Sequence, residues 1–197
     1  MSILSLAVAS EAAPRAVATV TIRTYNYAAV GFDELAAAQS EAAHIFRSAG
    51  ISVEWTGCRT RITVDGAACT EPLRSGHDLM LRLVDRTPVD RHVVVALGES
   101  MLDREERSGV LMTVDLFSIR AVADRASTSI ARLLGRAVAH EMGHILLGTA
   151  EHPRLGLMRA LWSHEELRGL KPAYWGFSAR ESAQMRDTLR AKSRVAD

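Results

Sequence analysis

Residues 137 to 148 place two histidines and a glutamate in an otherwise apolar stretch that predicts one α-helix. His140 and His144 are four residues apart, so on a helix they lie on the same face and can bind one metal ion. Glu141 is offset by about 100° from His140 and about 60° from His144, so its carboxylate lies beside such an ion without having to coordinate it. Two neutral imidazoles and a carboxylate that can accept a proton are the groups that a zinc hydrolase requires.

The alternative is an exposed helix that carries three polar residues and binds no metal. Apolar residues lie nearly all round the predicted helix, which argues against exposure. These residues are Ile130, Leu133, Leu134, Ala137, Val138, Met142 and Ile145. A buried helix needs partners for two histidines and a glutamate, and Zn²⁺ supplies them. We therefore expect zinc at this motif.

A catalytic zinc site needs a third protein ligand. The motif helix is expected to end at Gly148, because glycine readily adopts the left-handed conformation that follows a helix. The chain can then turn back and bring His152 to the pair, a reading we favour over a surface histidine in a loop. Glu151 is a substitute. A later helix offers further candidates, namely His164, Glu165 and Glu166.

The motif His140-Glu141-x-x-His144, followed by a glycine, by His152 and by residues 156–158 (Gly-Leu-Met), resembles the metzincin group of zinc metallopeptidases. In that group the third histidine usually lies ten residues after the first, whereas His152 lies twelve residues after His140. The resemblance implies an α/β (α+β) fold of the zincin type. Such a fold has a mixed twisted sheet with a helix on one side, an active-site helix and a C-terminal helix. It also implies hydrolysis of peptide bonds in a peptide or protein substrate.

Three further roles follow from this resemblance alone. A methionine in a tight turn forms an apolar floor beneath the zinc in metzincins, which implies that role for Met158; a flexible core residue is the alternative. A tyrosine near that turn binds a developing oxyanion in some members, which points to Tyr174, although packing is the alternative. An edge strand above the metal holds extended substrate, which suggests residues 109–116.

Two hypotheses compete with the peptidase. One is a zinc-stabilised binding module without turnover, in which Glu151 or a later side chain would close the site as a fourth ligand. The other is a gluzincin-type hydrolase, in which a later glutamate would be the third ligand.

The composition fits one globular domain over residues 17–197, preceded by a short segment, residues 1–16. The chain has 197 residues, of which 48% are hydrophobic and 24% charged, enough to form a substantial core. Its formal net charge of +1 argues against nucleic acid or an anionic membrane as the main partner. No apolar run approaches the length of a membrane span. The oligomeric state is left open.

Two features favour an exported protein, secreted or periplasmic, over a cytoplasmic one. Residues 3–13 resemble the end of a secretory signal, with small residues near a cleavage point. Cys58 and Cys69 are the only cysteines, and a disulfide between them would stabilise the fold by about 3 kcal/mol in the chain-entropy model. Two unrelated reduced thiols are the alternative.

Apolar periodicity outlines the other elements. Residues 17–25 and 51–55 alternate as strands, and the helical stripe 35–49 between them predicts a crossover with the two strands parallel. Asp33 is expected to cap that helix. The remaining expected elements are strands at 79–84 and 92–97, a charged solvated loop or substrate rim at 98–108, a strand at 110–116, and helices at 126–147, after 163, and at 178–192.

Two capping boxes and one glycine add detail. Ser163 with Glu166, and Ser178 with Glu181, have the spacing of a helix-starting capping box. Gly143 lies inside the motif helix, where it costs about 1 kcal/mol relative to alanine. We therefore expect another backbone segment to approach closely there.

Overall fold

A computed structural model of the chain describes residues 18–58, 69–74, 77–86, 96–103, 105–169 and 175–193. The predictions for residues 1–16, for His92–Val95 and for Tyr174 lie outside these ranges. The elements of the described residues are β1 (Ala18–Asn26), α1 (Phe32–Ser48), β2 (Ile51–Cys58), β3 (Asp78–Val84), β4 (Gly98–Asp103), β5 (Ser108–Asp115), α2 (Leu116–Ala126), α3 (Ile130–Leu147), α4 (His164–Arg168) and α5 (Ala179–Ser193).

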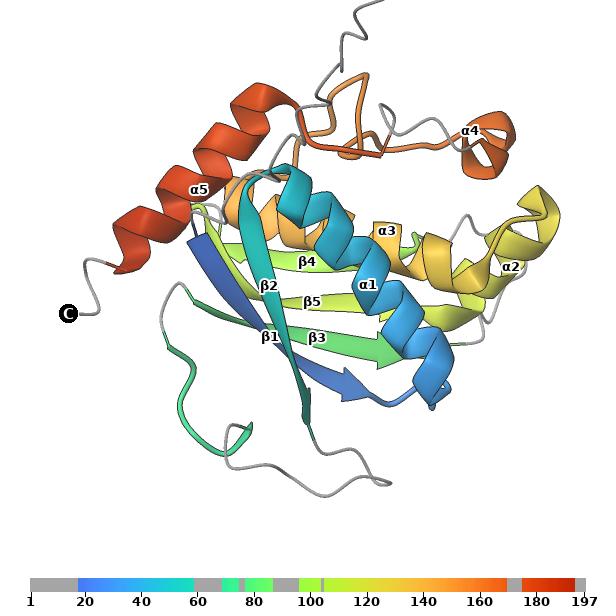
Figure 1. Cartoon of the computed structure of the whole chain (residues 1–197), viewed down its shortest axis with the longest axis horizontal. Coiled ribbons are helices and arrows are strands. Elements are labelled where there is room, and N and C mark those ends of the chain that lie inside the picture. Colours follow the sequence, from blue (N-terminus) through green and yellow to red (C-terminus); the bar gives the residue numbers. More distant parts are fainter. Residues whose placement is uncertain are drawn as a thin grey trace, which may run out of the picture.

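The strands form one mixed sheet in the order β2-β1-β3-β5-β4 (Figure 1). The first four strands in this order are parallel, and β4 runs antiparallel to β5. Val20 in β1 lies opposite Val53 in β2, with α1 as the connection between the two strands. The predicted strand–helix–strand crossover and the mixed α/β class are therefore confirmed.

The core lies between the sheet and the helices α1 and α3, which pack against each other over one face of the sheet (Figure 1). Alternate strand residues point into it, as the period of a strand requires. Ile22, Leu81 and Met112 from the sheet, Phe46 from α1 and Ile145 from α3 are at most 1% exposed. Each such side chain stabilises the fold by roughly 1.5–3 kcal/mol through burial. None of the described helices combines the length and hydropathy that a bilayer span needs.

Helix α5 holds the ends of α1 and α3 together. Gln184 Nε2 donates a hydrogen bond to the carbonyl of Leu147 at 2.9 Å, and Arg186 donates one to the carbonyl of Ala49 at 2.6 Å. Both carbonyls lie at the C-terminal end of a helix, where no intrahelical donor is available. The last helix thereby fixes the end of α3 from which the chain continues toward His152.

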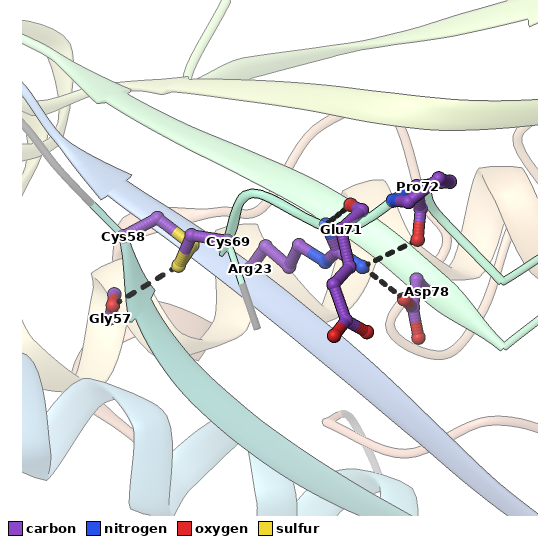
Figure 2. The surroundings of a disulfide bond; sticks show 7 residues. All are labelled: Arg23, Gly57, Cys58, Cys69, Glu71, Pro72 and Asp78. Carbon is purple, nitrogen blue, oxygen red and sulfur yellow. Dashed lines mark hydrogen bonds and ion pairs between the residues drawn. A yellow bond between two sulfur atoms is a disulfide. The ribbon is translucent and has the colours of Figure 1, made fainter. Parts of the chain in front are cut away.

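A disulfide and hydrogen bonds from Arg23 attach residues 69–74 to the sheet (Figure 2). Cys58, the last residue of β2, is bonded to Cys69, so the predicted disulfide is confirmed. Arg23 on β1 donates hydrogen bonds to the carbonyls of residues 71 and 72 at 2.6 and 2.9 Å. Arg23 also pairs with Asp78 at 2.7 Å, and both side chains are less than one-tenth exposed.

The structure corrects the expectation of a solvated loop over 98–108. Residues 98–103 form β4, whose positions 98, 100 and 102 are half-buried while the alternate positions, including Glu99 and Asp103, are exposed. The charged residues thus occupy the outward positions of a strand, where they also protect a sheet edge. The expectation that 110–116 is the edge strand is wrong as well, because β5 lies between β3 and β4. Ala96 and Leu97, expected to end a strand, precede β4 outside any strand.

The predicted helix over 126–147 is also corrected, because two helices meet there. Helix α2 ends at Ala126, and Ser127 follows in the left-handed conformation, with φ at 49°. Helix α3 begins at Ile130 with Ser129 as its N-cap. The polar residues between them interrupt the helical hydrogen bonding, since serine and threonine side chains compete for backbone groups.

Both predicted capping boxes are present, at Ser163 with Glu166 and at Ser178 with Glu181. The prediction that Asp33 caps α1 is wrong. That helix begins at Phe32 with Gly31 at the N-cap position, and no described side chain caps it. Asp33 lies instead in the first turn, where its negative charge favours the positive end of the helix dipole.

Candidate metal centre

Helix α3 carries the three motif residues, and its residues 133–147 are buried. The hydroxyl of Ser129 accepts a hydrogen bond from the backbone at its start, and Gly148 ends it in the left-handed conformation, with φ at 61°, as predicted. His140, Glu141 and His144 are 8%, 6% and 6% exposed. The prediction that this helix is buried is therefore confirmed, and its polar side chains need internal partners.

The Nε2 atoms of three histidines converge on one point. His140 Nε2 lies 3.0 Å from His144 Nε2 and 3.3 Å from His152 Nε2, and the last two nitrogens are 3.2 Å apart. His152 reaches the pair because the chain turns back after Gly148. His140 and His144 are buried, whereas His152 is exposed. In the part of the chain that the structure describes, these three form the group of side chains able to hold a metal ion.

The other ring nitrogens fix the protonation of the two helical histidines. His140 Nδ1 lies 2.9 Å from the carbonyl of Leu157, and His144 Nδ1 lies 2.8 Å from the carbonyl of Thr149. A carbonyl oxygen only accepts hydrogen bonds, so each Nδ1 carries the proton and each Nε2 presents its lone pair. Burial lowers the pKa of His140 to about 4 and lowers that of His144 as well. Both rings are therefore neutral near pH 7, the form in which imidazole binds a metal.

Glu141 is a buried carboxylate held from the edge strand. Its Oε2 accepts a hydrogen bond of 2.6 Å from the hydroxyl of Ser100 on β4. Burial raises the pKa of Glu141 to about 7, the hydrogen bond from Ser100 opposes this rise, and the negative charge of Glu99 adds to it. A Cβ atom at Gly98 would lie 2.8 Å from Cγ of Glu141, so this glycine provides the space for the carboxylate.

A tight turn over residues 156–158, here called the floor turn, packs against His140 and Gly143 of α3. Gly156, with φ at 82°, begins this turn, and Leu157 and Met158 follow it fully buried. A Cβ atom at Gly143 would lie only 2.5 Å from Sδ of Met158. The close approach predicted at Gly143 is therefore made by side chains, because those of Met158 and Phe177 come nearest. The expected backbone approach is corrected in that respect.

A cleft of ≈ 450 Å³ opens over the three histidines and Glu141. Its walls come from β4, from α2, from α3 and from the segment after the floor turn, which includes α4. Apart from the metal cluster and Glu141, the lining residues are Ala96, Leu97, Gly98, Glu99, Ser100, Leu102, Val122, Ala137, Ala150, Arg159, Ala160, Leu161, Trp162 and Leu167. The lining is mainly apolar, as in most sites that bind organic ligands.

No protein-family model matches the sequence, and no curated protein matches it. Solved structures match the fold. The crystal structure of archaemetzincin from Methanopyrus kandleri is 11% identical and has a TM-score of 0.51, over 93% of this chain and 99% of that chain. A zinc-dependent peptidase from Methanocorpusculum labreanum is 11% identical with a TM-score of 0.52, over 83% of this chain and 99% of that chain. This chain has a zinc-metallopeptidase fold.

The histidine cluster is compatible with the zinc that this metallopeptidase fold implies. Tetrahedral zinc with bonds of about 2.0–2.1 Å separates its nitrogen ligands by about 3.3 Å. The three separations here are 3.0, 3.2 and 3.3 Å. The unprotonated Nε2 atoms of His140 and His144 repel each other at 3.0 Å, and a cation between them removes that repulsion. The donor set therefore fits Zn²⁺.

The other candidate ligands lie outside this cluster of the metallopeptidase fold. Glu151 is exposed, and its N–H donates to the hydroxyl of Thr149. Glu166 is paired with Arg159. His164 and Glu165 belong to the exposed side of α4. Within the described ranges, no Asp, Glu or Cys joins the three histidines as a further ligand.

Several residues of this site could not be predicted from the sequence. Ser100 holds Glu141, and Gly98 makes room for it, but both contacts depend on β4 lying beside α3, which no local pattern shows. Trp162 Nε1 donates to the carbonyl of Leu157 at 3.3 Å, beside the bond from His140. For Gly98 and Ser100 the sequence offers one signal, because both lie in the charged stretch 98–108, which is also a candidate substrate rim.

Proposed function

We propose that the chain is a zinc-dependent metallopeptidase, with His140, His144 and His152 as the zinc ligands and Glu141 as the general base. The observation that carries this proposal is the convergence of three Nε2 atoms within 3.3 Å beside a buried carboxylate at the floor of a cleft. Three protein ligands leave a coordination position open, which is the arrangement of catalytic zinc sites. A structural site would need a fourth ligand, so the arrangement supports an enzyme over a zinc-stabilised binding module.

In the proposed hydrolysis, Glu141 moves the proton and Ser100 holds its carboxylate. A zinc ion in this site would supply Lewis acidity, which polarises a peptide carbonyl and acidifies water. Glu141 takes a proton from the attacking water at Oε1 while Ser100 holds Oε2. A carboxylate beside the attacking water can accept a proton and later release it, which is what a general base must do. Glu141 then passes the proton to the leaving nitrogen.

The cleft supports a peptide as the substrate. Among the described strands, β4 is an edge of the sheet, and it lines the cleft, so one side of its backbone is not paired with any of them. An extended peptide can add to such an edge through main-chain hydrogen bonds, which accept many side chains. The substrate-holding role expected for residues 109–116 therefore passes to β4, and Met158 takes the role of apolar floor.

Replacement of Glu141 tests the proposed mechanism. Glu141→Gln keeps the shape of the side chain and should retain zinc while lowering peptide hydrolysis by about 10²–10⁴-fold, the usual contribution of a general base. Glu151→Gln is the matched control, because it neutralises a nearby exposed glutamate and should change neither zinc content nor turnover. Full activity in a zinc-loaded Glu141→Gln protein would refute the assigned role.

The disulfide supports an exported protein, secreted or periplasmic. Disulfides form and persist in oxidising compartments and are rare in the cytosol, and the Cys58–Cys69 bond is present in the fold. Fractionation of cells that produce the full chain tests this location. A chain found in the cytosol with both cysteines reduced would contradict it.

A further inference from the structure

Helix α4 begins with a capping box whose glutamate also binds an arginine. Glu166 Oε2 accepts a hydrogen bond from the backbone N–H of Ser163 at 2.8 Å, and the hydroxyl of Ser163 accepts one from the N–H of Glu166 at 3.2 Å. The other oxygen of Glu166 forms an ion pair with the guanidinium of Arg159. The two charged side chains are 19% and 12% exposed, so water screens their attraction less than at an open surface. This pairing lowers the pKa of Glu166 to about 2, with the hydrogen bond from Arg159 as the largest cause.

Arg159 connects this pair to the floor turn. Its Nε donates a hydrogen bond of 3.1 Å to the carbonyl of Gly156, the residue with left-handed φ at the start of the turn. A guanidinium presents several donors in a rigid plane, so one side chain can bind the carboxylate and the carbonyl together. Arg159 therefore fixes the backbone of the turn relative to α4.

The next residue of the turn orients a histidine of the metal cluster. The carbonyl of Leu157 accepts the Nδ1–H of His140 at 2.9 Å, and Trp162 Nε1 donates to the same oxygen at 3.3 Å. The rings of Trp162 and His140 lie nearly perpendicular, with 5.7 Å between centroids. The position of this carbonyl decides where Nε2 of His140 points, because a ligand imidazole is oriented by the group that binds its other nitrogen.

We propose that Glu166 is a positioning residue for the metal site, which acts through Arg159 and the floor turn on the ring of His140. The path runs from the carboxylate of Glu166 through the guanidinium of Arg159 to the Gly156 carbonyl, and from the adjacent Leu157 carbonyl to Nδ1 of His140. The inference rests on the zinc site proposed above. It assigns to Glu166 a role different from zinc ligation and beyond helix capping.

The same path joins the metal site to the wall of the cleft. Arg159, Trp162 and Leu167 line the cleft, and Leu167 follows Glu166 in α4. A peptide bound against this wall would therefore contact the residues that fix the floor turn. Loss of the pair should loosen both the metal and the substrate wall.

The chain contains a matched control for Glu166. Glu181 forms the same capping box with Ser178, with hydrogen bonds of 2.7 and 3.2 Å, at the start of α5. Glutamine serves in a capping box as glutamate does, so Glu166→Gln and Glu181→Gln should both keep their helix caps. Only the change at Glu166 removes a charge that pairs with Arg159.

The experiment measures the zinc affinity of metal-free protein by competition with a chelator, together with the urea midpoint of unfolding. Glu166→Gln should bind zinc about tenfold more weakly than the wild type, at the lower end of the 10–100-fold loss usual for partners of metal ligands. Glu181→Gln should bind within about twofold of the wild type, with a similar urea midpoint for both variants. Arg159→Met should show the Glu166→Gln loss or a larger one, and the double variant should bind no more weakly than Arg159→Met alone, since both act on one path.

The outcomes separate the two levels of the proposal. A wild type that binds no zinc overturns the zinc site and this inference with it. If the wild type binds zinc and both Glu166→Gln and Arg159→Met bind it as tightly, the role of Glu166 is refuted while the zinc site stands. Additive losses in the double variant also overturn it, because independent effects would not follow one path. If Glu166→Gln does not fold, the comparison of Arg159→Met with Glu181→Gln decides in the same way.

Discussion

Adding one methyl group at Gly143 tests how closely the floor turn packs against α3. In a roomy helix interior, Gly143→Ala would stabilise the protein by about 1 kcal/mol, because alanine favours the helix. The new Cβ would lie 2.5 Å from Sδ of Met158 and 2.9 Å from Cε1 of Phe177. Ordinary contacts of this kind are about 3.5–4.0 Å, so Met158, which is 1% exposed, must move by about 1 Å.

The two effects oppose each other, and overpacking should win. Inserting a methyl group into a filled core costs about 1–3 kcal/mol, which exceeds the helix gain of about 1 kcal/mol. We expect a net loss of about 1 kcal/mol in the free energy of unfolding of Gly143→Ala, or about 2–4 °C in Tm. Urea unfolding of metal-free protein measures this without a contribution from bound zinc.

A double-mutant cycle with Met158→Ala identifies the cause of the loss. Met158→Ala leaves a cavity beside Gly143, so the added methyl group should then be neutral or stabilising. The coupling between the two changes should fall in the range of about 0.5–3 kcal/mol seen for residues in contact. A stabilising Gly143→Ala in the wild-type background, or strict additivity in the cycle, would refute the close packing of this floor.

Two further predictions concern the anchoring of residues 69–74. Replacing Cys58 and Cys69 by serine should lower the free energy of unfolding by about 3 kcal/mol, because the reduced chain gains loop entropy when unfolded, and zinc affinity, measured on the folded protein, should stay unchanged. Burial would raise the pKa of Asp78, but hydrogen bonds from Arg74 and Arg23 lower it overall. The stability from this ion pair should therefore be complete above about pH 4, the unfolded value, and be lost as the pH falls through the folded pKa. Asp78→Asn should lower the free energy of unfolding by about 3–5 kcal/mol at neutral pH, since it leaves Arg23 buried without its charge partner. In urea unfolding between pH 2 and 5, the stability of this variant should fall less with acid than that of the wild type. An equal fall would contradict this.

Local patterns predicted the parts of the fold that depend on neighbours along the chain. The strand–helix–strand unit at the start and both capping boxes follow from periodicities and spacings within a few residues. The motif helix carries His140, Glu141 and His144 at fixed offsets, so their relation to one another could also be predicted. His152 follows after a short loop, and its approach to the pair was predicted because the helix had a recognisable end at Gly148.

The contacts between distant segments could not be predicted in this way. Strand β4 was not predicted, because the charges at its outward positions are also typical of a loop. The position of β5 inside the sheet depends on its pairing with β4, which no local sequence pattern indicates. Ser100 reaches Glu141 only because that hairpin brings β4 against α3. The boundary between α2 and α3 had a readable signal in the serine and threonine residues at 127–129, which interrupt the helical pattern.

The three-histidine zinc site is tested most directly by the zinc content of the protein, measured by elemental mass spectrometry before and after dialysis against a chelator. The wild type should hold about one zinc ion per chain, and His152→Ala should lose it under dialysis that the wild type withstands. His164→Ala should behave as the wild type, because His164 lies in α4 outside the cluster. A His152→Ala protein that keeps its zinc as firmly as the wild type would contradict the three-histidine site.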